Sequence, residues 1–174
     1  MHPITDRSST GTHTRAVRVI CDLAQQSQAL ISSTLTGQTP MQEHNNIPSL
    51  FFAMMDREPS APAIFWKEGG QWPSMSWTDV GNDVASCARI LADLGVKKGT
   101  PVAIIAETRK EWAGVDMAIL CLGAITVGIY PTLLADQMAY VVSHSEAEVV
   151  IVENAKQAKK IEQFRHELPQ VRQI

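Results

Sequence analysis

The chain has little cysteine, and neither its cysteines nor its histidines show a metal-binding pattern. Three cysteines stand among 174 residues, no Cys-x-x-Cys occurs, and none of the five histidines has a cysteine or second histidine at a ligand-like offset. Widely spaced cysteines in odd number are typical of reduced thiols in a cytosolic protein, and zinc sites need closely spaced ligand pairs. We therefore predict no disulfide framework and no metal site from Cys21, Cys87 and Cys121.

Long apolar runs and charge of a single sign are also missing. No stretch approaches the length that crosses a bilayer, and residues 15–31 lack the unbroken apolar core of a signal peptide. The chain has 15 basic and 18 acidic residues, a net charge of -3 and no basic patch, which argues against nucleic acid as the main partner. The composition, 45% hydrophobic and 19% charged, is typical of a globular protein, and we expect a cytoplasmic one.

Motifs of nucleophilic, hydrolytic or nucleotide-binding sites are absent or incomplete. Neither Gly-x-Ser-x-Gly nor His-Glu-x-x-His occurs. Residues 8–14 are rich in serine and threonine, but they contain one glycine and no lysine follows, so they do not predict a phosphate loop. Gly95 and Gly99 precede a predicted strand, whereas the glycines of a dinucleotide fingerprint follow one. His144 has polar neighbours in sequence, but adjacent positions on a helix do not face each other.

The composition changes near residue 46. Residues 1–46 are rich in Ser, Thr, Gln and His and poor in aromatic residues. We interpret them as a mobile extension with one helix between Arg15 and Ser32. Residues 47–174 carry the folded part.

A helix and a hairpin are predicted at the start of the folded part. Pro48 suits the first turn of a helix. Residues 63–67 and 72–77 then flank the pair Gly69 and Gly70, which supplies the positive φ angles of a tight hairpin turn. The apolar stripe predicted for the helix consists of Leu50, Phe51, Met54 and Met55.

Helices and strands alternate from residue 78 onward. Thr78 is the predicted N-cap of a helix that Gly95 ends. Residues 102–106 are uniformly apolar, which is typical of a strand covered on both faces. Residues 108–111 have the form of a capping box for the next helix. The remaining predicted elements are strands 125–130 and 149–152, a helix with Met138, Val141 and Val142 inward, and a helix capped by Asn154 with Ala158, Ile161, Phe164 and Leu168 on one face.

This alternation has the spacing of βαβ units. It predicts an α/β fold, namely part of a doubly wound parallel sheet with flanking helices, preceded by the hairpin and the mobile extension. Residues 171–174 have the pattern of another strand beginning. We expect the sheet to continue beyond them in a longer protein, because a sheet edge left unpaired is unfavourable.

Polar side chains follow two of the predicted strands. In open parallel sheets, ligands bind at the carboxyl ends of the strands. The position therefore suits a binding crevice, although capping and solvation alone would also explain these residues. The cluster comprises Glu107, Thr108, Arg109, Tyr130, Pro131 and Thr132.

Ordered matches over residues 47–174 resemble the AMP-forming acyl-CoA synthetases. Residues 75–80, Met-Ser-Trp-Thr-Asp-Val, and residues 88–99, ending Leu-Gly-Val-Lys-Lys-Gly, are similar to the family's opening helix and the turn after it. Residues 108–112, Thr-Arg-Lys-Glu-Trp, and 123–132, ending Ile-Tyr-Pro-Thr, continue the match. The departures Thr100, Lys110 and Gly128 fall at loop or packing positions. The Tyr-Pro-Thr form, with Gln137, Ala139 and Tyr140, favours the long-chain fatty acyl-CoA synthetase branch.

The resemblance implies a ligase that adenylates a fatty acid with ATP and Mg²⁺ and then forms a thioester with coenzyme A. The family's phosphate loop ending Pro-Lys-Gly, its Tyr-Gly-x-Thr-Glu and Thr-Gly-Asp elements and its C-terminal lysine are all missing from this sequence. No catalytic, cofactor-binding or metal-binding residue can therefore be carried over. The implied partners of the parent enzyme are fatty acid, ATP, CoA and the remainder of the synthetase, with peripheral contact at the inner membrane face.

Three functions remain open at this point. In the first, which we prefer, the chain is an N-terminal fragment of a long-chain acyl-CoA synthetase and is inactive by itself. Alternatively, it is a stand-alone, non-catalytic α/β module that interacts with or regulates a full-length relative. A third reading is a small flavodoxin-like nucleotide-binding protein.

Limited proteolysis should remove most of residues 1–46 and leave residues 47–174 largely intact. The extension carries too few large apolar groups to offset the entropy of ordering it, and exposed tails are cleaved first. Trypsin should cut near Arg7, Arg15 and Arg18, as read by mass spectrometry of the fragments. Protection of these sites, with earlier cleavage after Lys98, would place the domain boundary elsewhere.

Overall fold

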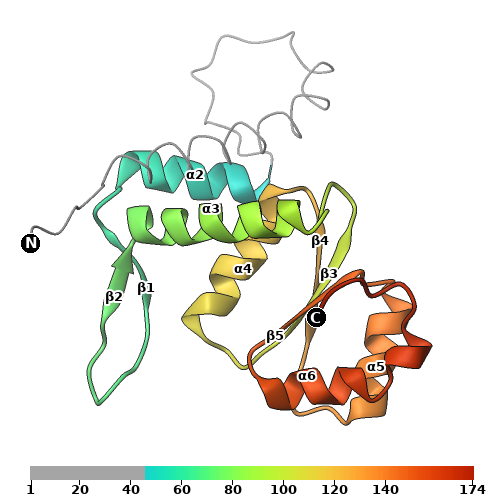
Figure 1. Ribbon diagram of the computed structural model, residues 1–174. Helices are drawn as coiled ribbons and strands as arrows, with labels where there is room; N and C mark the ends of the chain where they lie inside the picture. The colour runs from blue at the N-terminus through green and yellow to red at the C-terminus, as the bar shows by residue number, and fades with distance from the viewer. Residues whose placement is uncertain (1–45) are drawn as a thin grey trace, which may run out of the picture.

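The computed structural model describes residues 46–174, which form a three-stranded parallel sheet with helices on both faces and a separate antiparallel hairpin (Figure 1). In chain order the elements are α2 (Ile47–Arg57), β1 (Pro62–Phe65), β2 (Ser74–Ser76), α3 (Trp77–Asp93), β3 (Pro101–Ile105), α4 (Lys110–Cys121), β4 (Ile125–Ile129), α5 (Ala135–His144), β5 (Val149–Val152), α6 (Ala155–Glu162) and the 3-10 helix η2 (Arg165–Glu167). The predicted α/β class is confirmed. No helix in this part of the chain has both the length and the apolar character needed to cross a membrane. The predictions for residues 8–14, Cys21 and the helix between Arg15 and Ser32 lie outside the described residues.

The central strand is β3, which pairs in parallel with β4 on one side and β5 on the other. Its residues from Val102 to Ile105 are at most 2% exposed. Val102 and Ile104 contribute to the core under α3 and α4, while Ala103 and Ile105 contribute to the core under α5 and α6. The apolar run is thus that of a strand covered on both faces, as its sequence predicts.

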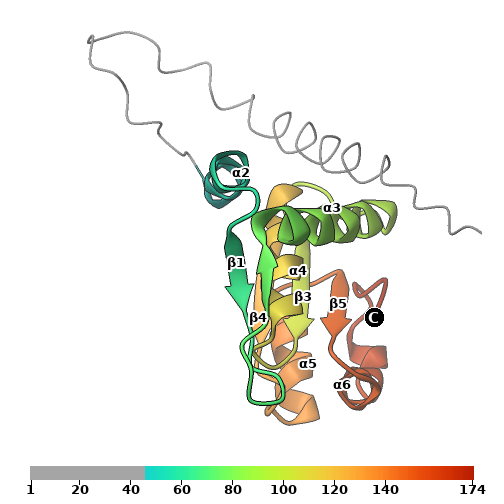
Figure 2. The same cartoon turned by 90° about the vertical axis from the view of Figure 1, so that its left-hand side faces the viewer.

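The two helical layers enclose two separate cores (Figure 2). On one side α3 and α4 pack against the sheet and α2 packs on these two helices, and on the other side α5 and α6 pack against the sheet. The predicted stripe of α2 is partly wrong: Phe51 and Phe52 are buried, whereas Leu50 is 49% exposed. The aromatic contacts set this rotation of the helix, because the ring of Phe51 packs edge-on against Phe52 at 5.5 Å and against Trp77 at 5.9 Å between centroids.

The hairpin forms where the sequence predicts it. Strands β1 and β2 pair antiparallel, and Glu68 bridges to Gln71 across the turn. Gly69 and Gly70 have φ angles of +56° and +81°, which side chains with a Cβ rarely adopt. The Gly-Gly pair therefore acts through backbone conformation, since no atom lies within 4 Å of an added Cβ at either position.

The N-cap of α3 is Ser76 and not Thr78. The Ser76 side chain accepts a hydrogen bond from the backbone N–H of Asp79, and the Asp79 carboxylate accepts from that of Ser76. Thr78 instead donates its hydroxyl to the carbonyl of Pro59. The hydrogen bonds from Ser76 lower the pKa of Asp79, so their contribution to stability is present above the pKa of an unfolded aspartate and lost as pH falls through the lower folded value.

At the C-terminal end of the chain, residues 171–174 run beside β5. The backbone N–H of Arg172 donates to the carbonyl of Glu148, and that of Val150 donates to the carbonyl of Gln173. The segment therefore lies parallel to β5 and forms an isolated bridge between Gln173 and Val149, so a further strand after residue 171 stays a prediction. The last helix is shorter than its sequence predicts, because α6 ends at Glu162 and η2 leads on to the buried side chain of Leu168.

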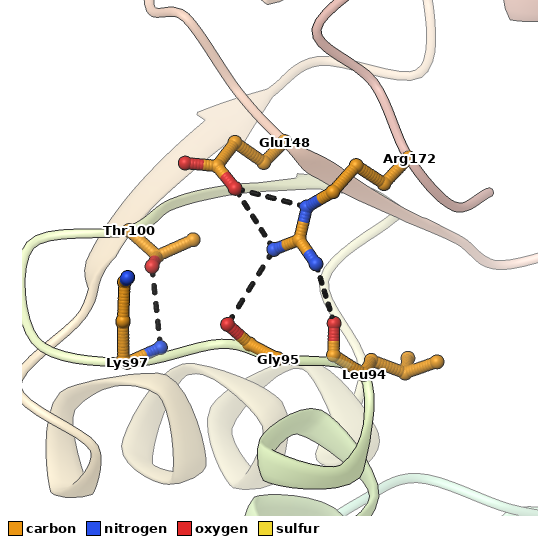
Figure 3. A network of polar contacts seen from close by, with 6 residues as sticks. All are labelled: Leu94, Gly95, Lys97, Thr100, Glu148 and Arg172. Carbon is orange, nitrogen blue, oxygen red and sulfur yellow. Dashed lines mark hydrogen bonds and ion pairs between the residues drawn. The ribbon is translucent and has the colours of Figure 1, made fainter.

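The Arg172 guanidinium joins this segment to the end of α3 (Figure 3). It binds the Glu148 carboxylate at 2.8–2.9 Å and donates at 2.7 Å to the carbonyl oxygen of Leu94 and at 3.5 Å to that of Gly95. Carbonyl groups at a helix C-terminus lack partners within the helix and carry partial negative charge. The Arg172 side chain thus supplies hydrogen bonds to carbonyl groups at the end of α3 and an ion pair to Glu148. Both contacts hold the last segment in place.

Replacing Arg172 by alanine should lower the free energy of unfolding by about 1–2 kcal/mol. The variant loses hydrogen bonds to a carboxylate and to helix-end carbonyls, at a site that solvent partly screens. Urea unfolding followed by circular dichroism measures the change. Arg57→Ala is the control, because Arg57, within residues 46–174, pairs with its exposed neighbour Glu58, and the variant should cost less than about 0.5 kcal/mol.

Alanine substitutions at two glycines test the same contact between Arg172 and the end of α3. Gly95 and Gly99 have φ angles of +81° and +83°, so an alanine strains both alike. Only at Gly95 would the new Cβ meet an atom, Nη1 of Arg172 at 2.9 Å. Gly95→Ala should therefore destabilise more than Gly99→Ala, and equal losses would show that the Arg172 contact contributes little.

Candidate functional site

A cavity of about 530 Å³ opens where β3 and β4 end. Its walls come from the segment after β3, the first turn of α4, the last residues of β4 and the loop that follows. The lining residues are Ala106, Glu107, Thr108, Arg109, Trp112, Ala113, Gly128, Ile129, Tyr130 and Pro131. Five of the six residues in the polar cluster predicted from the sequence line this cavity, and the sixth, Thr132, does not.

The parallel register brings these segments together. Ile105 is the partner of Ile129, so the residues that follow each strand emerge side by side at the same edge of the sheet. The connections then leave in opposite directions, since α4 packs in one core and α5 in the other. A crevice between neighbouring strands is expected at such a point of an open parallel sheet.

Trp112 supplies the aromatic wall of the cavity. It is the third residue of α4 and is half-buried against the core under α3 and α4. The indole lies next to Gly128 of β4, where an added Cβ would be 3.6 Å from Cζ2. Tyr130, by contrast, is 77% exposed at the mouth. A lining of apolar and aromatic residues with a few polar ones suits an organic ligand.

The guanidinium among the lining residues is paired with a carboxylate of α4. Nε of Arg109 donates to the Glu111 carboxylate at 2.7 Å. This hydrogen bond is the main reason that the pKa of Glu111 is lowered and that of Arg109 raised. Directly after β5, the Glu153 carboxylate accepts a hydrogen bond from the backbone N–H of Glu107 at 2.9 Å. The described lining residues include no lysine, so by themselves they do not form a phosphate site.

The capping box predicted for residues 108–111 is wrong. The N-cap of α4 is Arg109, without a side-chain hydrogen bond, and the box does not form. The Glu111 carboxylate that would have completed the box is bound by the Arg109 side chain instead. Thr108 therefore lines the cavity without a capping role.

The loop after β4 has partners on α6 that the sequence does not reveal. Gln157 and Lys160 donate side-chain hydrogen bonds to its backbone, 26 to 29 residues away along the chain. No local motif predicts contacts between such distant positions. They are the residues near the site that sequence reasoning missed.

The other side chains considered from the sequence are dispersed. His144 stacks on Tyr140 with ring centroids 5.6 Å apart, and it is not one of the described residues that line the cavity. Cys121 is buried, and burial raises the pKa of the half-buried Cys87 thiol. Within residues 46–174 no group of three or more His, Cys, Asp or Glu side chains could hold a metal ion.

The family match covers most of the described chain. Residues 51–174 match the family described as AMP-binding enzyme. The chain is 33% identical over 132 residues to the long-chain-fatty-acid–CoA ligase FadD15 of Mycobacterium bovis, over 76% of this chain and 22% of that protein. It is 26% identical over 178 residues to the long-chain-fatty-acid–CoA ligase heimdall of Drosophila melanogaster, over 100% of this chain and 24% of that protein.

Solved structures share the fold. A Mycobacterium tuberculosis fatty acyl CoA synthetase superposes with a TM-score of 0.66 at 25% identity, over 74% of this chain and 26% of that one. The anthranilate CoA ligase AuaEII, solved with anthranoyl-AMP, gives 0.65 at 25% identity, over 73% and 24%. The chain thus spans about a quarter of the length of the proteins that it resembles.

Thr108→Ala should change the free energy of unfolding by less than about 0.5 kcal/mol, because Thr108 is exposed and does not cap α4. Ser76→Ala is the matched comparison and should cost about 1 kcal/mol, since Ser76 caps α3. Thermal and urea unfolding of both variants measure the difference. A loss of 1 kcal/mol or more at Thr108 would mean that the hydroxyl caps α4 after all.

Proposed function

Because the chain belongs to the AMP-binding enzyme family, we propose that it is the N-terminal part of a long-chain fatty acid–CoA ligase. In that reaction the fatty acid carboxylate attacks the α-phosphorus of ATP and pyrophosphate leaves. The coenzyme A thiolate then attacks the acyl carbonyl and AMP leaves. The observation that carries the proposal is the continuous 132-residue match to such a ligase, which includes both strands that border the cavity.

The described residues contribute a wall of the site and not its chemistry. Stabilising charge at an α-phosphate requires a lysine, a metal ion and backbone donors together. The cavity has a guanidinium already paired with Glu111 and no lysine ammonium, and this part of the chain holds no metal-ligating cluster. These residues do not fit ATP and Mg²⁺ by themselves. We assign no catalytic, cofactor-binding or metal-binding residue to the chain.

The proposal also covers the domain organisation of the parent enzyme and its location in the cell. Residues 47–174 are the opening subdomain of the ligase, and residues 1–46 precede it as an extension. The remainder of the synthetase supplies the binding of ATP, Mg²⁺ and CoA. The parent enzyme is cytoplasmic and contacts the inner membrane face peripherally, because long acyl chains partition into bilayers by about 0.8 kcal/mol per buried CH₂ group.

The 174-residue chain alone should show no fatty-acid-dependent exchange between ATP and pyrophosphate. The physical reason is the missing lysine, metal site and phosphate loop. Radiolabelled pyrophosphate, ATP, Mg²⁺ and palmitate provide the assay, with FadD15 as the positive control. Exchange clearly above background would contradict the inactivity of the isolated chain.

A chimera tests the family role itself. Residues 47–174 replace the matching segment of FadD15, and acyl-CoA formation from palmitate is measured. A folded chimera that retains ATP-dependent and CoA-dependent activity supports the proposal. A folded chimera with no activity would favour the stand-alone module, which needs no match to the ligase site.

A further inference from the structure

The loop after β4 is fixed from a distant helix. Nζ of Lys160 donates to the carbonyl oxygen of Pro131 at 2.9 Å and to that of Leu133 at 2.8 Å. Nε2 of Gln157 donates to the same Pro131 oxygen at 3.2 Å. Three side-chain hydrogen bonds from α6 therefore converge on two carbonyl groups of one loop, two residues apart.

The donors are themselves firmly placed. Gln157 is only 6% exposed, and Lys160 is half-buried one turn further along the same face of α6. Asn154 caps the helix by accepting from the backbone N–H of Gln157, and Ile161 is fully buried in the core below. A buried donor without a partner is costly, and bonds from an ammonium group are about twice as strong as neutral ones. The arrangement therefore holds the loop strongly.

The anchored loop is one wall of the cavity. Pro131 is buried and lines it, directly after Tyr130 at the mouth. Among the described residues, the backbone hydrogen bond that the loop makes within itself runs from the N–H of Leu133 to the carbonyl of Tyr130, at 3.2 Å. The Tyr130–Pro131 wall is thus held by hydrogen bonds from α6 in addition to its own turn.

We propose that Lys160 and Gln157 are positioning residues, which set the Tyr130–Pro131 wall of the strand-end cavity at its working distance from Trp112. The inference rests on the proposed function, in which this cavity is part of the ligase site. Neither side chain lines the cavity, so each acts through the loop. A purely structural role would predict only a general loss of stability when either residue is replaced.

The test uses the full 174-residue chain and two variants, Lys160→Met and Gln157→Leu. Amide hydrogen exchange measures the opening of the loop at Leu133. Exchange there should rise about tenfold in Lys160→Met, which loses two charge-assisted bonds, and less in Gln157→Leu. Lys160→Arg should restore slow exchange, and Lys159→Met is the control because Lys159 is exposed on the same helix.

A second readout reports on the cavity. The chain is labelled with 5-fluorotryptophan, and the resonance of Trp112 is assigned with Trp112→Phe. The resonance should shift in Lys160→Met and Gln157→Leu but not in Arg172→Ala, which is destabilised at a remote place. Unchanged exchange at Leu133, or equal acceleration in β3 and the loop without a shift of the Trp112 signal, would overturn the positioning role. Neither readout depends on acyl-CoA formation, so failure of this role and failure of the proposed function are distinguishable.

Discussion

The burial of β3 on both faces is the constraint on which the rest of the molecule depends. Its alternate side chains enter two different cores, so neither helical layer can form fully without this strand. β4 and β5 both take their register from it. The cavity also follows from this arrangement, because the β3–β4 register places two strand ends together while their connections diverge to opposite faces.

Patterns that act locally were enough to predict much of the fold. The apolar run at residues 102–106, the Gly69-Gly70 turn and the Asn154 cap each act within a few residues, and the structure confirms them. The α/β class followed from the alternation of such segments. Strand order did not follow, because placing β5 beside β3 rather than β4 is decided by packing across the whole sheet.

The error at the start of α4 arose because two groups compete for one carboxylate. At α4 the sequence offers Thr108 and Glu111 as a capping box, but the neighbouring Arg109 binds the carboxylate. Ionic pairing with a guanidinium outweighs the weaker bond to a backbone N–H. For the candidate site, the strand-end cluster was predictable from the general behaviour of parallel sheets. Its support from Lys160 was not, since that contact spans up to 29 residues.

The Arg172 network has a consequence for the order of folding. The β3–α4–β4 unit consists of contacts between neighbours in sequence and can form early, while the bonds from Arg172 reach back 77 and 78 residues to Gly95 and Leu94. Contacts that close long loops form late, because the chain loses the entropy of closing the loop before it gains the energy of the contact. During synthesis, the end of α3 therefore leaves the ribosome well before its partner. Until then its terminal carbonyl groups must be satisfied by water, and the last segment of this chain completes a helix made much earlier.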